Sequence, residues 1–568
     1  MKYSPVTPAL RALTALVVIL LAPRAIAQDG TWISTSYDGY WSDSSNWVGN
    51  TVADGANHTA TFNSEGDDEI TVDVDASRTI GHLIFSNSGY GGFRLISYGG
   101  NHVLTLAGDA PSITVNNRMR LPIEVVIAGD SGLIKAGDGR LDLYASNTYT
   151  GGTIISDGEV LLRNIAGLGS GNVVVAAGAQ LTFDVPGTFT NNLTFGNNAL
   201  LASTSGGMSY VTGDITLTGD LRLQTFSNSH LIFSGTISGD FALKTISPDA
   251  GSITFAGTAA NTYTGSTTID HGMLILAKTE GVTAVSGDLI SSQSVRFDAS
   301  HQIADTSAVT LNDSGTLNLN GQTETIGSLA SSSGSSSVTL GTGGALTVGA
   351  ANTSTTFAGV ISGAGTLTKI GTGNFTLSGA NTFTGGTTLN AGTLTLGSAN
   401  ALLNATGKLL VTGGSLNTSV ANTTVGGDIE FTGGTLSING ADAGALTLAE
   451  GKNFTMSDGT IEFTLGTSFD QIISLGDGAL SLTGSTINLT LGDGFDYYSY
   501  YALFLNFTTA HFNALTITGY DTLNYVASIS NMGVLSFSAS AVPEPSTYAL
   551  LAGLGVLGIA MWRRRAVR

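Results

Sequence analysis

Residues 381–387 read Asn-Thr-Phe-Thr-Gly-Gly-Thr, and close copies of this heptapeptide stand at 147–153 and 261–267, where the third residue is Tyr. Such self-similarity indicates one structural unit that is used several times along the chain. Asn tolerates a left-handed backbone and Gly supplies positive φ, so we expect each heptapeptide to form a corner between strands.

Strand-like segments flank each heptapeptide. Upstream lies an apolar residue or pair beside a lysine, and we interpret Lys135, Lys244 and Lys369 as equivalent structural positions of the repeat. Downstream, residues 393–396 read Thr-Leu-Thr-Leu, which places apolar side chains on one face and Thr on the other. One unit cannot bury that apolar face alone, whereas stacked coils bury it as a continuous core. The sequence therefore predicts an all-β solenoid.

The repeat resembles the autotransporter-associated β-strand repeat, also called the passenger-associated transport repeat. The third copy matches best, over residues 363–399, and the second is degraded, with Ser266 in place of Gly and an insertion around Pro248. The resemblance implies a right-handed parallel β-helix, and the residues between the two chain ends would form roughly 20 coils.

The N-terminal part of the body contains three of the four tryptophans, Trp32, Trp41 and Trp47, ahead of an alternating segment at 70–74. The first coil of a β-helix has an open edge that needs a cover. We expect these indoles to form an aromatic N-terminal cap. A carbohydrate-binding platform is the alternative.

The first 27 residues are typical of a signal peptide. An apolar run at 12–22 follows basic residues, and Ala25 and Ala27 form a small-x-small cleavage site. The mature chain would begin near Gln28. An uncleaved membrane anchor is the alternative, although the run is short for a spanning helix.

The C-terminus has three parts in a fixed order. An extended, proline-containing strip comes first, an apolar run at 548–562 follows, and a basic cluster comes near the end. The strip is Val542, Pro543, Glu544 and Pro545, and the basic cluster is Arg563, Arg564 and Arg565. The apolar run predicts a single transmembrane helix, and the arginines predict that the body lies outside the cytoplasm.

This order resembles the PEP-CTERM sorting domain. In that family an exosortase, a membrane peptidase, is thought to process the tail during export. The resemblance implies that Val542 to Pro545 form the recognition motif and that the three arginines are the stop-transfer signal. A simple C-terminal anchor is the alternative.

These features divide the chain into five predicted segments. They are a signal peptide (1–27), an N-terminal cap with the first coils (28–130), a solenoid (131–465) with repeats at about 131–183, 236–285 and 358–412, terminal coils (466–540), and the sorting signal (541–568). The tyrosine-rich stretch at 497–501 is expected to pack within the terminal coils, with a sticky surface as the alternative.

Composition excludes several classes of function. The 568 residues include no Cys, which excludes disulfides and thiolate metal sites. A formal net charge of −20 gives no electrostatic footprint for nucleic acid. The seven His are scattered without metal spacing, and acidic clusters such as 65–69 match no calcium motif, so we expect no metal and no cofactor. Weak Ca²⁺ binding by these clusters is the alternative to solvated turns.

No catalytic motif stands out either. Gly129-Asp130-Ser131-Gly132 resembles a serine-protease motif, but Leu133 replaces the next Gly. We therefore expect a non-enzymatic protein: a structural or adhesive component of an exopolysaccharide-associated matrix, exported, membrane-anchored before processing, and then at the cell surface. Its expected partners are an exosortase and an exopolysaccharide. A β-helix polysaccharide lyase or hydrolase is the alternative.

Overall fold

The computed structural model describes residues 27–540, apart from 88–90, 100, 227 and 247–250. In this part the chain forms 57 strands and two short 3-10 helices. It contains no helix of the length and apolarity that crossing a membrane requires, as far as the described residues extend. The predicted signal peptide up to residue 26 and the predicted C-terminal transmembrane helix lie outside the described residues.

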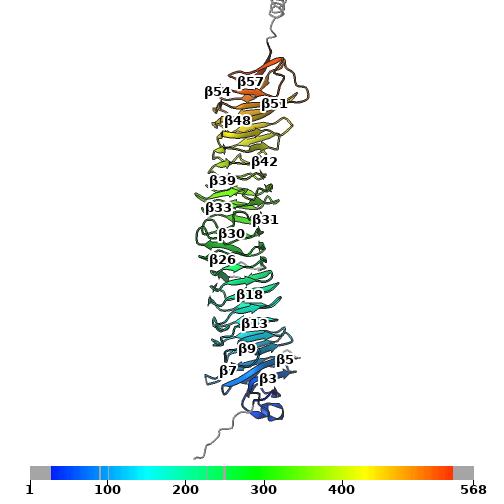
Figure 1. Cartoon of the computed structure of the whole chain (residues 1–568), viewed down its shortest axis with the longest axis vertical. Coiled ribbons are helices and arrows are strands. Elements are labelled where there is room, and N and C mark those ends of the chain that lie inside the picture. The colour runs from blue at the N-terminus through cyan, green and yellow to red at the C-terminus, as the bar shows by residue number, and fades with distance from the viewer. Residues whose placement is uncertain (1–26, 88–90, 100, 227, 247–250, 541–568) are drawn as a thin grey trace, which may run out of the picture. The chain divides into compact units, whose positions relative to one another are not determined.

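The described residues divide into two compact units, one that extends to residue 154 and includes 166–171, and the other made of 155–165 and the residues from 172 onward. Each unit is a parallel β-solenoid in which strands stack rung upon rung (Figure 1). Together the units contain about 19 turns, close to the number expected from the repeat. The parallel solenoid is therefore confirmed, and the five segment boundaries stay predictions.

The first unit contains two main columns of parallel strands. One column is β1 (Gly30–Trp32), β3 (Gly55–Ser64), β5 (Arg78–Asn87), β8 (Ser112–Val115) and β11 (Leu133–Ala136). The other is β2 (Asp38–Tyr40), β4 (Ile70–Asp73), β6 (Phe93–Ile96), β9 (Arg120–Ile123) and β12 (Arg140–Leu143). Also in this unit, β7 (Val103–Leu106) pairs with β5 and with β10 (Val126–Ala128).

The second unit shows how in-register stacking builds the core. Its nine-stranded sheet is β17 (Gly187–Phe189), β20 (Met208–Val211), β23 (His230–Phe233), β26 (Ser252–Gly257), β28 (Met273–Lys278), β30 (Ser294–Phe297), β32 (Thr316–Asn318), β35 (Ser337–Thr339) and β38 (Val360–Ser362). Alternate residues of successive strands fall in one buried column, such as Phe233, Phe255, Leu276 and Phe297. Alternation along each strand thus becomes one apolar core.

A second large sheet of this unit has 15 strands. One of its columns is β33 (Thr323–Ile326), β36 (Ala345–Val348), β39 (Thr366–Lys369), β41 (Thr387–Leu389), β43 (Leu409–Val411) and the first part of β46 (Ile429–Ser437). The other includes β37 (Thr355–Phe357), β40 (Asn374–Leu377), β42 (Thr393–Leu396), β44 (Ser415–Thr418), the second part of β46, β48 (Phe454–Leu465), β51 (Thr486–Leu491) and β55 (Thr516–Thr518).

Glycines of the repeat allow neighbouring corners to touch. A Cβ on Gly385, the first Gly of the third heptapeptide, would lie 2.2 Å from the carbonyl oxygen of Gly365 in the preceding coil. A Cβ on Gly407 would likewise lie 2.1 Å from the carbonyl oxygen of Gly385, and a Cβ on Gly427 would lie 2.0 Å from that of Gly407. We conclude that this glycine column is set by the approach of stacked corners, where any side chain would clash with backbone.

The three N-terminal tryptophans form a buried cluster around Phe62. Trp32, Trp41 and Trp47 are at most 1% exposed, and each ring centroid lies 5.4–5.8 Å from that of Phe62. The 3-10 helices η1 (Ser44–Asn46) and η2 (Val48–Asn50) flank the third indole. Because the indole faces are buried, the carbohydrate-platform alternative is wrong, and the residues pack as an aromatic cap does.

The last coils of the second unit carry a small antiparallel sheet of β52 (Tyr501–Ala502), β57 (Val534–Ala539) and β56 (Tyr525–Ile529). The tyrosine stretch at 497–501 is divided between two roles. Tyr497 stacks on Tyr525 with centroids 3.9 Å apart, and Tyr501 is buried. Tyr498 and Tyr500 are 83% and 77% exposed. The expectation of pure packing is therefore only half right.

Candidate functional site

The Asn of each heptapeptide ties three coils together. In the third copy, the Asn381 Oδ1 atom accepts the N–H of Ile361 at 2.8 Å, and Nδ2 donates to the carbonyl of Ala401 at 2.8 Å. Asn147 makes the same pair of bonds to Ile127 and Gly167, and Asn261 makes it to Ile237 and Ala284. Each amide thus satisfies one backbone group of the coil before and one of the coil after.

The aromatic residue of the heptapeptide is also internal. The hydroxyl of Tyr149 lies 2.7 Å from Thr153 Oγ1, and that of Tyr263 lies 2.6 Å from Thr267 Oγ1. Burial raises the pKa of both phenols. In the third copy Phe383 fills the same kind of site without a hydroxyl. The repeat signature is therefore structural. Its second and fourth residues, both Thr, are exposed in all three copies, as is Gly151 in the first.

Two of the three repeat lysines are buried in carbonyl cages. Lys369 Nζ donates to the carbonyls of Ile370 at 2.6 Å, Gly371 at 2.9 Å and Ala391 at 3.2 Å. Desolvation lowers the pKa of Lys369. Lys135 is fully buried and bonds to carbonyls in the same way. These lysines confirm a structural role at this corner.

The predicted equivalence of Lys244 is wrong. Strand β25 (Leu243–Thr245) places Thr245 at the inward position, so Lys244 points outward and pairs with Asp270 at 2.8 Å. A shift of one residue along a strand reverses the face that a side chain occupies. A further buried lysine, Lys278, was missed: its Nζ donates to the carbonyls of Gly235, Ala256 and Ala259.

Two buried carboxyl groups are held by backbone amides. Glu324 accepts the N–H groups of Gln302 at 2.7 Å and Ile303 at 3.4 Å, and burial raises its pKa to about 7. Asp470 accepts those of Gly444 at 2.7 Å and Thr464 at 2.6 Å, and burial raises its pKa to about 6. A shifted pKa is also typical of catalytic acids, but these two groups face backbone and not a cleft.

A glycan-cleaving site needs paired carboxylates that reach a sugar. The fully buried carboxylate Asp142 lies between Arg120 and Arg140, with N–O distances of 2.8 and 2.7 Å, so both of its oxygens are engaged. Across residues 27–540, outside the gaps given above, no three His, Asp or Glu side chains are grouped to hold a metal ion. In the acidic segments, Asp73 and Asp75 accept backbone N–H groups of nearby loops.

One outer surface of the second unit has an unusual chemistry, and we call it the Thr face. It consists of the residues that alternate with core positions in seven stacked strand segments from β40 to β55, two per strand and in register, and of these residues Thr395 is buried. The pairs are Asn374 and Thr376, Thr393 and Thr395, Ser415 and Asn417, Thr435 and Ser437, Thr460 and Glu462, Thr486 and Asn488, and Thr516 and Thr518.

The Thr face is a regular and nearly uncharged array. Glu462 is its single charged residue, and the other positions are Thr, Ser or Asn. Rows repeat every ~4.8 Å along the stack, and the two side chains of a row stand about 6.6 Å apart. Some neighbours bond to each other, as Thr395 Oγ1 does to Asn374 Oδ1 at 2.8 Å. The alternation of Thr was visible in the sequence, but the register that aligns the rows was not.

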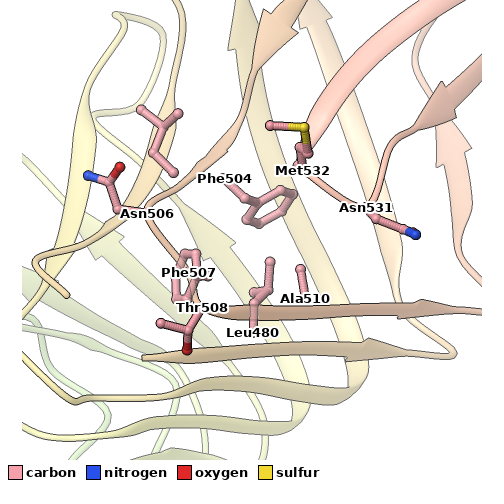
Figure 2. Close-up of a pocket in the computed structure, with 10 residues that line it drawn as sticks. Leu480, Phe504, Asn506, Phe507, Thr508, Ala510, Asn531 and Met532 are labelled. Atoms are coloured by element: carbon pink, nitrogen blue, oxygen red, sulfur yellow. The ribbon is translucent and has the colours of Figure 1, made fainter. Parts of the chain in front are cut away.

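A pocket of about 460 Å³ lies at the end of the second unit (Figure 2). Its wall includes Leu480 of β50 (Ala479–Thr483), Phe504 of β53 (Phe504–Leu505) and Ala510 of β54 (Thr509–Asn513), with Met532 at its edge. None of its lining residues is charged or is a His. The pocket has a mixed lining, with Asn506, Thr508 and Asn531 beside apolar residues, and offers no acid or base for catalysis.

The predicted sorting residues cannot be placed. Ala25, Val542, Pro543, Glu544, Pro545, Arg563, Arg564 and Arg565 lie outside the described residues. Ala27 is the first described residue, and Gln28 forms a two-way backbone bridge with Asp54 at 2.8 and 3.1 Å. The proposed mature N-terminus thus coincides with the point where the chain joins the first coil.

Comparison with protein families identifies both signatures. The passenger-associated transport repeat matches residues 133–162, 249–276 and 367–396. The PEP-CTERM protein-sorting motif matches residues 541–565. The chain therefore carries the repeats and the sorting motif that the sequence predicted. The motif implies processing by an exosortase and export to the cell surface.

One curated relative, described as "Adhesin BmaC autotransporter" of Brucella suis biovar 1 (strain 1330), is 31% identical over 296 residues. The similarity covers 44% of this chain and 8% of the relative. This chain thus matches less than a tenth of that relative's length.

Proposed function

We propose that this chain, with its solenoid repeats and its C-terminal sorting motif, is a non-enzymatic structural or adhesive component of an exopolysaccharide-associated matrix. It is exported with the help of its N-terminal signal, held in the membrane by its tail, and released to the cell surface after an exosortase acts on Val542 to Pro545. Its coils follow the right-handed crossover that almost all parallel strand connections use.

The Thr face is the observation that carries the adhesive part of this proposal. Its hydroxyl and amide groups both donate and accept hydrogen bonds, as sugar hydroxyls do. Single contacts of this kind are weak, but an array of rows can bind many units of one polymer at the same time. The similarity to a protein described as an adhesin supports the same role.

The test is binding of the mature protein to the exopolysaccharide of its host. Replacing Thr393, Thr435 and Thr486 by Val removes three hydroxyls and keeps β-branched side chains of nearly equal shape. We expect at least a tenfold loss of apparent affinity, because the bonds act together. The control variant replaces Thr316 and Thr339, which face outward on the nine-stranded sheet, by Val. It should bind the exopolysaccharide as the unchanged protein does.

Two outcomes would contradict the proposal. Equal binding by both variants would remove the Thr face from adhesion. New reducing or unsaturated sugar ends in the incubated polymer would show cleavage, and the alternative of a β-helix lyase or hydrolase would replace the structural role.

Sorting is tested separately by the intact mass of the protein recovered from envelope and medium. The proposal expects a released species that begins near Gln28 and lacks Arg563 to Arg568, and expects that a Pro543→Ala/Pro545→Ala variant does not form it. A membrane species that keeps its arginines in both proteins would leave the tail as a simple anchor.

A further inference from the structure

The last coils of the second unit expose large apolar side chains that the preceding coils do not. Within the described residues, no large hydrophobic side chain is exposed between Phe241 and Leu475. From there to the end of β57, seven are exposed: Leu475, Leu491, Tyr498, Tyr500, Leu523, Val526 and Met532. Exposed apolar groups that gather in one region mark an interaction surface.

The most exposed of these residues, Leu523, stands on a braced turn. Asp521 accepts the N–H groups of Leu523 at 3.1 Å and Asn524 at 3.2 Å, and also the side-chain amide of Asn524 at 2.7 Å. These bonds lower the pKa of the Asp521 carboxyl. Leu523 is 86% exposed on this fixed turn.

Tyr498 is presented by a packed loop. Its neighbour Tyr497 stacks on Tyr525, and the Tyr497 hydroxyl oxygen accepts the backbone N–H of Asp521, in the same turn, at 2.9 Å. The N–H of Tyr498 itself donates to Asp496 Oδ1 at 3.0 Å. A Tyr with an apolar ring and a polar tip suits the boundary between lipid and water.

This surface lies where the chain leaves the solenoid. Tyr525 pairs with Ala539 across β56 and β57, and the N–H of Ser540 donates to the carbonyl of Asn524 at 2.7 Å. The apolar run of the tail begins at residue 548, so the connecting residues 541–547 span at most about 28 Å. An anchored tail therefore keeps Ser540 within that distance of the bilayer, and Leu523 lies beside Ser540 through the Asn524 bond.

The charge of this region selects the kind of lipid surface. The sequence from residue 453 to 562 contains no Lys or Arg, and Asp496 and Asp521 adjoin the exposed Tyr498 and Leu523. Attraction to anionic headgroups needs basic residues, which are missing. Contact must therefore come from insertion of apolar and aromatic side chains into the bilayer surface. Because the anchored tail holds this surface near the bilayer, the contact is effectively intramolecular.

We propose that this end of the second unit docks on a zwitterionic bilayer surface through Leu523 and Tyr498. Docking holds residues 541–547, which contain the Pro-Glu-Pro motif, close to the membrane. The inference rests on the proposed function in one respect, namely that the tail anchors the unprocessed chain.

The test uses the full chain with its tail in phosphatidylcholine vesicles. Because the chain has no Cys, a polarity-sensitive fluorophore can be placed at one position, in Leu523→Cys or in the control Met208→Cys. Met208 is 50% exposed on β20, away from these coils in sequence. If the surface docks, the emission of the label at 523 shifts to the blue and is quenched by a lipid-borne quencher. Both effects are lost when Tyr498→Ser is added, and the label at 208 shows neither.

Each other outcome overturns the inference. A label at 523 that an aqueous quencher reaches equally with and without vesicles excludes docking, while flotation of the protein with the vesicles still supports the anchor. A chain that does not float overturns both the anchor and the docking. A blue shift that depends on protein concentration at constant lipid assigns the surface to a second copy. A larger fluorescence change at 523 when phosphatidylglycerol is added would contradict the inference that the surface prefers zwitterionic over anionic lipid.

Discussion

Individual residues of the repeat act mainly through backbone groups that they satisfy. The Asn amides and the buried lysines both bond to peptide groups at corners, where stacked coils leave donors and acceptors without ladder partners. The sequence identified these residues as repeated, but it could not show that their partners lie one coil before and one coil after.

At this scale we predict that Asn381→Ala lowers the free energy of unfolding by about 2–4 kcal/mol, because the Ile361 N–H and the Ala401 carbonyl lose their buried partner. The exposed neighbour gives a matched control, Thr382→Ala, which should change stability by less than about 0.5 kcal/mol. Urea unfolding followed by circular dichroism measures both. Equal urea midpoints for the two variants would mean that water takes over the hydrogen bonds of the Asn381 amide.

The buried Glu324 makes stability depend on pH. Its pKa is about 7 in the folded chain against 4.5 for the ordinary group, so the folded state retains a proton that the unfolded state releases. The stabilisation is complete below about pH 4.5 and is lost as the pH rises through 7, by up to about 3 kcal/mol. Glu324→Gln should flatten this part of the stability profile. A profile unchanged by the substitution would contradict the raised pKa.

Among the elements, the strands and their stacking were predictable and their register was not. Alternation of Thr and Leu at 393–396 predicts a strand with one buried face; the structure buries both leucines, and Thr395 on the other face is buried as well. Lys244 was misplaced because a single-residue slip reverses a face, and the sequence of the degraded repeat contains nothing that fixes the slip. The Thr face depends on the register of seven paired strands, which the sequence does not specify.

The glycine column gives a prediction about how elements meet. Gly385→Ala places a Cβ 2.2 Å from the carbonyl oxygen of Gly365, which forces two coils apart, and we expect a loss of about 3 kcal/mol or more. At Gly334 the nearest heavy atom would be 4.0 Å away, so Gly334→Ala should be nearly neutral. Thermal unfolding of the two variants compares them directly. Similar melting temperatures would show that the corner can relax.

For the whole molecule, composition and repeats predicted the parallel solenoid because its core depends on alternation and not on particular residues. The same property hid the candidate sites. A binding array of Thr looks like any exposed strand face in sequence, and the exposed residues near the C-terminus are scattered between 475 and 532. Only the pairing of β56 with β57 and the bond from Ser540 to Asn524 place Leu523 beside the exit of the chain.

In-register stacking has a consequence for how such a chain changes length in evolution. Thr435 lies directly above Ser415, and its N–H already bonds to the carbonyl of Gly414 at 2.8 Å. Deleting residues 415–434 would join neighbours in space and remove one complete rung, so the shortened protein should still fold cooperatively, whereas deleting half as many should not. Insertions and deletions that this architecture tolerates should therefore add or remove whole coils.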